Sequence, residues 1–248
     1  MAVRDLRSQR LYLDAPLQAG SEIALTSEQA HYLANVLRAK AGMELLVFNG
    51  RDGEWLAGLA EVSRKSGTLR VVSQTRAQTD GPDVTYMFAP LKRARLDYLV
   101  QKATELGVRR IVPVLTAHTV ADRVNLDRMR ANVIEAAEQC GVLRLPELVA
   151  PQKLNAALDA WPASAPLIFC DEAAAVSDPV TTLSAVPRAP IAVLIGPEGG
   201  FSANERADIL ARENVTAVSL GPRVMRADTA AVAILSLVNA TLGDWRAF

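Results

Sequence analysis

Two short segments of the chain combine residue types that can hold a ligand and act on it. Gly196–Ser202 (GPEGGFS) contains three glycines and a proline directly after an apolar run. Glycines expose backbone N–H and C=O groups without side-chain bulk, so a flat ligand can approach them closely. Leu220–Ala230 (LGPRVMRADTA) adds two arginines, a carboxylate and a threonine. An arginine in such a loop can stabilise negative charge that develops on a reacting group.

Each segment also has a purely structural explanation. The first could be a plain turn from a strand into a helix, because Ser202 and Glu205 have the spacing of a capping box. The second could be surface charge beside a helix whose N-cap is Asp228 or Thr229. Since both loops follow apolar strands, a shared ligand site is the better interpretation of the pair.

The elements around these loops predict an α/β fold. From residue 84 onward, short apolar runs alternate with stretches in which apolar residues recur at helical spacing. This alternation predicts a mostly parallel sheet covered on both faces, with ligands at the carboxyl ends of its strands. The predicted strands are Val84–Ala89, Arg110–Leu115, Leu167–Cys170, Ile191–Ile195 and Val215–Leu220. The predicted helices cover Leu96–Leu106 (ended by Gly107), Leu126–Ala137, a stretch from Ser202, and about Asp228 to Leu242.

The N-terminal part of the chain has a different texture. Short β-like runs separated by glycine turns predict a small barrel or sandwich, with one helix at Ser27–Ala39. The polar stretch Ala77–Asp83 marks a boundary, so we expect one domain at residues 1–76 and a second at 77–248. The β-like runs are Leu11–Leu13, Met43–Asn49, Glu54–Val62 and Thr68–Ser73.

Composition narrows the classes of function. The 248 residues include 27 Lys and Arg and 27 Asp and Glu, so any nucleic-acid site must be a local basic patch. Cys140 and Cys170 lack CxxC spacing and the two histidines lie far apart, so we expect no metal site. The start of the chain lacks the apolar core of a signal peptide, and Ala230–Val238 is too short to cross a bilayer. We therefore expect a soluble cytoplasmic protein.

The two loops resemble the cofactor-binding motifs of SPOUT-class RNA methyltransferases. Residues 31–50 (HYLANVLRAKAGMELLVFNG), 89–114 (APLKRARLDYLVQKATELGVRRIVPV) and 138–148 (EQCGVLRLPEL) are similar to one family of that class, the RsmE-type ribosomal RNA uridine-N3 methyltransferases. The resemblance extends from about Arg10 to Val238. It implies a trefoil-knotted C-terminal α/β domain, a PUA-like N-terminal β-barrel that binds RNA, and a homodimer that holds RNA across both subunits.

The resemblance also implies a reaction and its residues. A methyl group would pass from S-adenosylmethionine, without a metal, to N3 of a uridine in the decoding region of 16S ribosomal RNA within the small subunit. Arg226 would stabilise the uridine anion, and Asp228 or Glu198 would accept the N3 proton or orient Arg226. The residues expected to bind cofactor are Leu194, Gly196, Gly199, Leu220, Gly221, Met225, Arg226, Thr229 and Ala230.

Basic residues supply the expected RNA contacts. A cluster of charges is usually only a solvated surface, so the resemblance is what favours phosphate binding here. It favours RNA contacts for Arg10, Arg38, Lys92 and Arg144, and we include His31, which belongs to the same basic cluster as Arg38. The chain departs from the family pattern at Asp228, where a glutamate is usual, and at residues 116–119 (TAHT), where Thr-Glu-Arg-Ser is usual.

Two other functions stay open from the sequence alone. One is ribose 2′-O-methylation by an enzyme of the same superfamily. The other is a non-catalytic RNA-binding factor for ribosome assembly that retains the fold. The site of methylation on the RNA separates the first of these from base methylation, and turnover separates the second from both enzymes.

Overall fold

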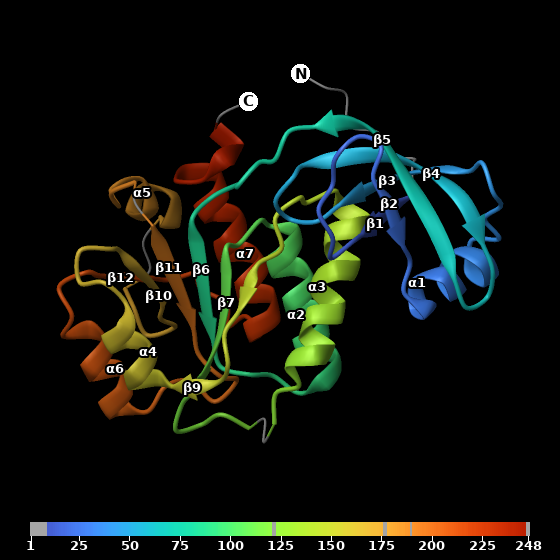
Figure 1. Ribbon diagram of the computed structural model, residues 1–248. Coiled ribbons are helices and arrows are strands. Elements are labelled where there is room, and N and C mark those ends of the chain that lie inside the picture. The colour runs from blue at the N-terminus through green and yellow to red at the C-terminus, as the bar shows by residue number, and fades with distance from the viewer. Residues whose placement is uncertain (1–8, 121–122, 176–177, 189, 247–248) are drawn as a thin grey trace. The chain divides into compact units, whose positions relative to one another are not determined.

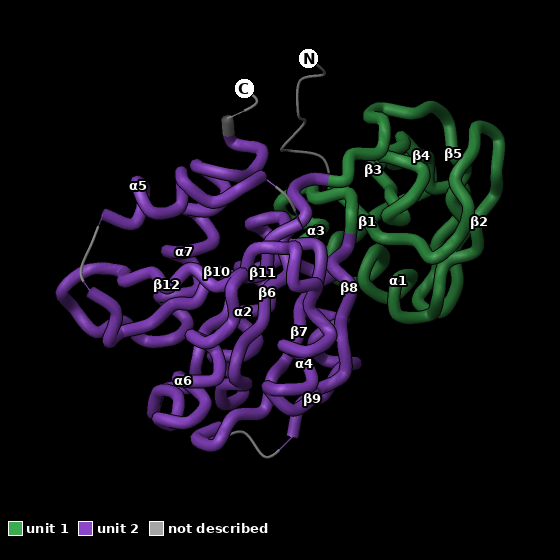
Figure 2. The backbone as a smooth tube through the Cα atoms, turned by 90° about the vertical axis from the view of Figure 1, so that its left-hand side faces the viewer, with its two compact units in different colours: residues 1–80, 137–144 green, residues 81–136, 145–248 purple. Residues whose placement is uncertain are grey.

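The chain divides into two compact units (Figure 2). The computed structural model describes residues 9–120, 123–175, 178–188 and 190–246. The first unit comprises residues 1–80 and 137–144, and the second comprises residues 81–136 and 145–248. The end of one helix and the turn after it therefore cluster with the N-terminal unit, which sequence order alone does not indicate. In the described part of the chain, no helix is long and apolar enough to span a membrane.

The first unit is built on a five-stranded sheet with the order β1-β3-β4-β5-β2 (Figure 1). β1 pairs parallel with β3, and the other pairs are antiparallel. Leucines, valines and alanines from these strands form its core together with Ala30 and Leu33. In chain order the elements are β1 (Arg10–Tyr12), β2 (Glu22–Ala24), α1 (Ser27–His31), a π-helical turn (Tyr32–Val36), β3 (Glu44–Phe48), β4 (Glu54–Val62) and β5 (Gly67–Arg76).

The helix of this unit is shorter than the predicted Ser27–Ala39. Thr26 caps it, because its side chain accepts from the Gln29 N–H while the Gln29 side chain accepts from the Thr26 N–H. The α-helix ends at His31, and the next turn is π-helical. Arg38 then takes a left-handed conformation with φ of 52°, so the chain leaves the helical path before Ala39.

A buried ion cluster centres on Glu54 at the start of β4. Arg10 donates from Nε to one carboxylate oxygen at 3.0 Å, and Arg76 donates from Nε to the other at 3.0 Å. Arg76 also donates to the Gly141 carbonyl at 2.9 Å, which ties the turn at residue 141 to this unit. The side chain of Arg10 is 2% exposed. The predicted RNA contact of Arg10 is therefore wrong, because its guanidinium is buried against a carboxylate and does not face solvent.

The second unit is a parallel α/β structure, as predicted. Its sheet has the order β12-β10-β11-β6-β7-β8, with β9 also pairing with β7, and every pair is parallel. The strands are β6 (Val84–Phe88), β7 (Arg110–Leu115), β8 (Glu147–Leu148), β9 (Gln152–Lys153), β10 (Leu167–Cys170), β11 (Ile191–Ile195) and β12 (Val215–Val218). The helices are α2 (Arg93–Glu105), α3 (Leu126–Cys140), α4 (Leu154–Ala160), α5 (Pro179–Ser184), α6 (Ala203–Leu210) and α7 (Ala227–Thr241), followed by a 3-10 turn (Asp244–Arg246).

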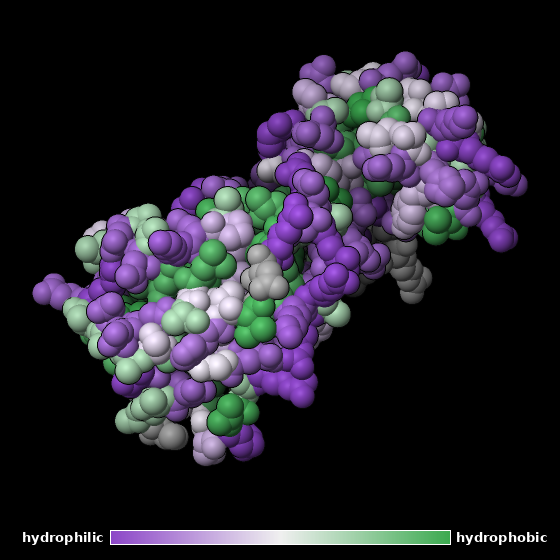
Figure 3. Space-filling view, turned by 90° about the horizontal axis from the view of Figure 1, so that it is seen from below, coloured by the Kyte–Doolittle hydropathy of each residue, from purple (hydrophilic) through white to green (hydrophobic). Residues whose placement is uncertain are grey.

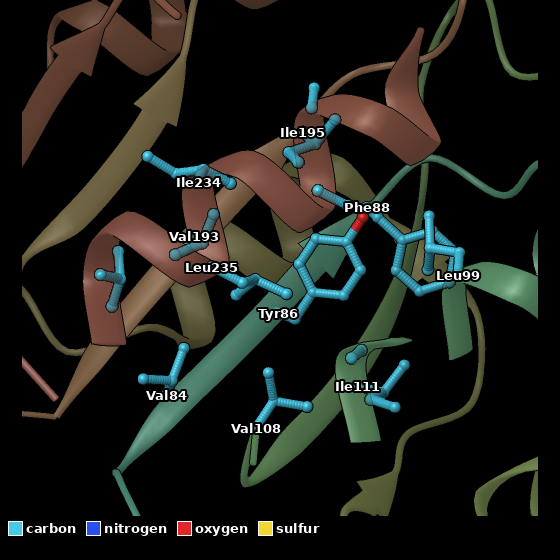
Figure 4. Packing of buried hydrophobic residues seen from close by; sticks show 14 of the residues in the cluster. Val84, Tyr86, Phe88, Leu99, Val108, Ile111, Val193, Ile195, Ile234 and Leu235 are labelled. Atoms are coloured by element: carbon cyan, nitrogen blue, oxygen red, sulfur yellow. The ribbon is translucent and has the colours of Figure 1, made fainter. Parts of the chain in front are cut away.

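Alternation along the central strands divides the core between the two faces of the sheet. Tyr86 and Phe88 of β6 point to the face covered by α2 and α7, where their rings stack at 5.1 Å (Figure 4). Met87 between them points to the opposite face, which α4 and α6 cover (Figure 1). β6 and β11 are buried along their whole length, which explains their uninterrupted apolar sequences.

The hydroxyl group of Tyr86 lies inside this core. Tyr86 is fully buried, and among the described residues no partner hydrogen-bonds its hydroxyl. Burial raises the pKa of Tyr86 well above its usual value, with smaller contributions from Cys170 and Asp228. The phenol therefore stays protonated, and its ring serves packing between β6 and α7.

The Glu54 cluster generates a stability prediction. Glu54→Ala removes the shared carboxylate and leaves the Arg10 guanidinium buried without it, so we expect a loss of about 3–5 kcal/mol in the free energy of unfolding. Glu44→Ala, at an exposed position of β3, should stay within about 0.5 kcal/mol of the parent. Urea unfolding followed by circular dichroism measures both variants. Equal stability of the two would show that the cluster contributes little.

Candidate active site

The loops that follow β10, β11 and β12 enclose a cavity of about 530 Å³. These strands are parallel neighbours, so their carboxyl ends lie at one edge of the sheet and their loops converge. Figure 3, seen from below Figure 1, shows hydrophobic patches on that side interrupted by hydrophilic residues. The lining comprises Phe169–Ala173 at the end of β10 and after it, Ile195–Glu198 with Gly200, Phe201 and Arg206 from the end of β11 into α6, and Val218–Ala227 with Ala230 from the end of β12 into α7.

An aromatic ring shapes the glycine loop after β11. A Cβ atom on Gly196 would lie 2.5 Å from Cε2 of Phe201, so only glycine leaves room for this ring. Phe201 packs edge-on against Phe169 of β10, with ring centroids 5.3 Å apart. Gly200 has φ of +69°, in the left-handed region that favours glycine. Side-chain packing therefore shapes the loop, and Gly196 and Gly200 line the cavity without side chains of their own.

Ala117 and His118, which follow β7, contact the glycine loop and the start of α6. The Glu205 carboxylate accepts from the Ala117 N–H at 2.7 Å and completes the predicted capping box with Ser202. His118 Nδ1 lies 3.0 Å from the Gly200 carbonyl oxygen. Burial works against the charge on Glu205, but hydrogen bonds from Ser202 and Ala117 outweigh it and lower its pKa. The atypical residues 116–119 thus support the loop through backbone groups and one histidine.

The loop after β12 carries Arg226 into the cavity lining. Arg226 is exposed, and its side chain forms no hydrogen bond or ion pair with the described residues. It is also the N-cap of α7, so the predicted N-cap at Asp228 or Thr229 is wrong. Asp228 lies inside the first turn, and its carboxylate accepts from the Thr229 N–H at 2.9 Å. Within the described chain, no ion pair joins Asp228 to Arg226.

The sequence did not predict that Asp171 and Glu172, which follow β10, line the cavity together with Arg206. Asp171 is 5% exposed, and its carboxylate accepts from Nη2 of Arg206 at 2.8 Å and from Nε of Arg206 at 3.0 and 3.2 Å. Glu172 follows it and is exposed within the cavity lining. Burial raises the pKa of the neighbouring Cys170 thiol to about 12, so this thiol is not a nucleophile at neutral pH. The position of these residues after a strand was the only available signal.

The structure brings most of the predicted catalytic and cofactor residues to this cavity. Among the predicted set, Leu194 points into the core between the sheet and α4, and a Cβ on Gly199 would lie 3.5 Å from the Cβ of His118. Thr229 is exposed on α7, and both Thr229 and Asp228 lie outside the lining. The predicted residues that line the cavity are Gly196, Glu198, Leu220, Gly221, Met225, Arg226 and Ala230.

The predicted RNA-binding residues are distributed over both units. In the first unit, His31 and Arg38 are exposed and Arg144 is half-buried. His31 Nδ1 lies 2.8 Å from the side-chain amide of Asn35. In the second unit, Lys92 is exposed at the N-cap of α2. Their contacts with RNA stay predictions, while their exposure leaves His31, Arg38 and Lys92 accessible to a phosphate backbone.

Comparison with known proteins places the chain in a family. The sequence profile of the RNA methyltransferase domain matches residues 79–239, and that of the RNA methyltransferase PUA domain matches residues 25–72. The chain belongs to this family of RNA methyltransferases. It is 32% identical to the ribosomal RNA small subunit methyltransferase E of a Synechocystis species, over 89% of this chain and 73% of that protein.

Solved structures show the same fold. A putative methyltransferase from Legionella pneumophila, in complex with bound S-adenosylmethionine, is 30% identical with a TM-score of 0.83, covering 96% of this chain and 99% of that one. The ribosomal RNA small subunit methyltransferase E of Neisseria gonorrhoeae, bound to S-adenosylmethionine, is 26% identical with a TM-score of 0.86, covering 96% and 100%. The α/β unit of this methyltransferase is therefore SPOUT-like, with a small PUA β-domain before it. The implied trefoil knot stays a prediction.

The glycine loop generates a prediction about cofactor binding. Gly196→Ala places a methyl group where the Phe201 ring lies, so the ring or the loop must shift and distort the cavity wall. We expect affinity for S-adenosylmethionine to fall at least about tenfold, measured by titration calorimetry. Gly199→Ala is the matched control, because Gly199 lies outside the cavity lining and its Cβ would meet His118 at an ordinary 3.5 Å. Equal affinities of the two variants would contradict this role of Gly196.

Proposed function

We propose that this protein transfers a methyl group from S-adenosylmethionine to N3 of a uridine in the ribosomal RNA of the small subunit. The observation that carries the proposal is the cavity at the ends of β10, β11 and β12, lined by the two loops that resemble cofactor motifs. The comparison with known proteins supports it, because the chain is 32% identical to a ribosomal RNA small subunit methyltransferase E. The choice of uridine N3 rests on the family resemblance.

The cavity suits the cofactor in size and in chemistry. A volume of about 530 Å³ is in the range of sites for molecules of this size. Gly196, Gly200 and Gly221 leave backbone groups accessible, and Gly221 has φ of +102° with open space where a Cβ would lie. When bound, S-adenosylmethionine supplies an electrophilic methyl group on its sulfonium, so the protein's task is to orient the acceptor and manage its proton.

Arg226 is the residue that we assign to the reacting base. Uridine N3 carries a proton at neutral pH, and its removal spreads negative charge over the two carbonyl oxygens. Arg226 lies in the cavity lining with its side chain unengaged by the described residues, while the start of α7 fixes its backbone. A guanidinium keeps its charge across the working pH range, so it suits stabilisation of the anion better than proton removal.

Glu198 is better placed than Asp228 to accept the N3 proton. Glu198 lines the cavity, and its side chain is 51% exposed. It pairs with Arg95 of α2, which holds the carboxylate beside the glycine loop. Asp228 lies outside the lining, and its carboxylate already accepts from the Thr229 N–H. We therefore assign proton acceptance to Glu198 and a local structural role to Asp228.

RNA binding and assembly complete the proposal. The N-terminal unit, with exposed His31 and Arg38, would bind the RNA backbone, and exposed Lys92 at the start of α2 would contact it in the second unit. The match of residues 25–72 to an RNA methyltransferase PUA domain supports this division of work. We also propose a cytoplasmic homodimer acting on the small ribosomal subunit, as the resemblance implies. Val224, which lines the cavity and is 87% exposed, offers apolar surface that a second copy would cover.

The reaction is tested with the purified protein, methyl-labelled S-adenosylmethionine and small-subunit particles that lack the modification. Nuclease digestion and mass spectrometry should find the label on the base of a uridine, as N3-methyluridine. Label on a ribose oxygen would replace the proposal with 2′-O-methylation. Cofactor binding without transfer to free RNA or to subunits would favour the non-catalytic assembly factor.

Arg226→Ala tests the assigned chemistry. We expect the single-turnover rate at saturating RNA and cofactor to fall about 100-fold or more, the scale for losing one charge-stabilising donor. The parent rate should rise with pH through the neutral range, because N3 must lose its proton. Affinity for S-adenosylmethionine should change much less, since backbone groups carry most of that binding.

The control for this variant is Arg188→Ala. Arg188 is exposed and lies outside the cavity lining, so its removal changes the net charge equally without touching the site. If Arg226→Ala binds RNA more weakly yet reacts at the parent rate once saturated, Arg226 contacts a phosphate and has no part in the chemistry.

A further inference from the structure

Three carboxylates line the cavity, and two of them are already neutralised. Asp171 is held by the guanidinium of Arg206 at 2.8 Å and also accepts from the Ala173 N–H at 3.0 Å. Glu198 is paired with Arg95. Glu172 forms no hydrogen bond or ion pair with any residue in the described ranges. The cavity therefore presents one carboxylate whose charge the described protein does not compensate.

Glu172 lies between two loops of the cavity. It follows β10 directly, and its Oε1 atom lies 3.0 Å from the position that a Cβ on Gly200 would take. Its carboxylate thus lies beside the backbone of the glycine loop, at the lining and not in the core. Asp171, the preceding residue, is anchored by hydrogen bonds from both Nε and Nη2 of Arg206 in α6. That anchor holds the backbone from which Glu172 extends.

The cofactor offers one group that matches such a carboxylate. Its adenine and ribose are neutral, and the exposed backbone of the glycine loops can satisfy them. Its sulfonium is positive but has no N–H or O–H to donate. Its α-ammonium group is positive and has three N–H donors. A hydrogen bond between an ammonium and a carboxylate is roughly twice as strong as a neutral one, so the ammonium gains most from Glu172.

We propose that Glu172 binds the α-ammonium group of the methionine part of S-adenosylmethionine, with the Asp171–Arg206 pair positioning the loop that carries it. The inference rests on the proposed function, because it places that cofactor in this cavity. It assigns to Glu172 a contact that product and substrate share, since S-adenosylhomocysteine keeps the ammonium after the methyl group has left. Glu172 therefore contributes to cofactor affinity, and not to discrimination between cofactor and product.

Three ligands distinguish this contact from the alternatives. S-adenosylmethionine has the ammonium and the sulfonium, S-adenosylhomocysteine has the ammonium alone, and 5′-methylthioadenosine has neither but keeps adenine and ribose. Titration calorimetry on the full-length protein compares the parent with Glu172→Gln, which removes the charge and keeps the size. We expect the variant to bind the first two ligands at least about tenfold more weakly, and the third within about twofold of the parent.

The control variant is Glu213→Gln, which removes an exposed carboxylate outside this cavity and should bind all three ligands as the parent does. Equal weakening of all three ligands by Glu172→Gln would assign Glu172 to the ribose and overturn the inference. Weakening of S-adenosylmethionine alone would assign it to the sulfonium, and unchanged affinities would remove it from the site. A parent protein that binds none of the ligands would instead overturn the proposed function itself.

Discussion

The site depends on one constraint, which is that both faces of the parallel sheet are covered. β6 and β11 are buried along their whole length between α2 and α7 on one face and α4 and α6 on the other. A ligand therefore cannot reach the backbone of these strands from either face. Polar backbone groups become accessible only where the strands end, and three strands end side by side. The cavity forms because these three strands end side by side and because the glycines in the loops after β11 and β12 leave space there.

Packing against the loops gives that edge its shape. The Phe201 ring occupies the space that a side chain on Gly196 would need, and Phe169 of β10 holds the ring. Glu205 then connects the same loop to the segment after β7. Glycine at residue 196 is thus required by an aromatic neighbour inside the loop as well as by access for a ligand. Such a loop is rigid because of side-chain packing, although its ligand-facing groups belong to the backbone.

The sequence predicted the strands and helices that show a local hydrophobic pattern. It missed the contacts that arise only from the order of strands in the sheet. β7, β10 and β11 begin and end at the predicted residues, because each is a buried run with sharp boundaries. β2, β8 and β9 have two or three residues, too few to show a period. Arg10 was misassigned because its burial arises from Glu54, 44 residues away. Asp171, Glu172 and Arg206 were missed because no local pattern places β10 between β11 and β12.

In the cavity, backbone groups of the glycine loops are expected to hold the neutral parts of the ligand, whereas charged side chains are expected to take part in the reaction and to bind charged groups. Glycine loops offer the ligand neutral donors and acceptors, whose positions depend on the strand ends and on the packing of Phe201 against Phe169. Charge comes from a few side chains, and some of these are held in pairs: Asp171 with Arg206, and Glu198 with Arg95. A paired charge is fixed in place: Arg206 holds Asp171 at the start of the loop that carries Glu172, and Arg95 holds Glu198 at the cavity, where it is assigned to accept the proton. Among the described lining residues, Glu172 after β10 and both Arg223 and Arg226 after β12 lie in no ion pair, and the two loops thus present opposite charges. A ligand that is positive at one end, and a reacting base that becomes negative, would each find the complementary charge there without any movement of the sheet.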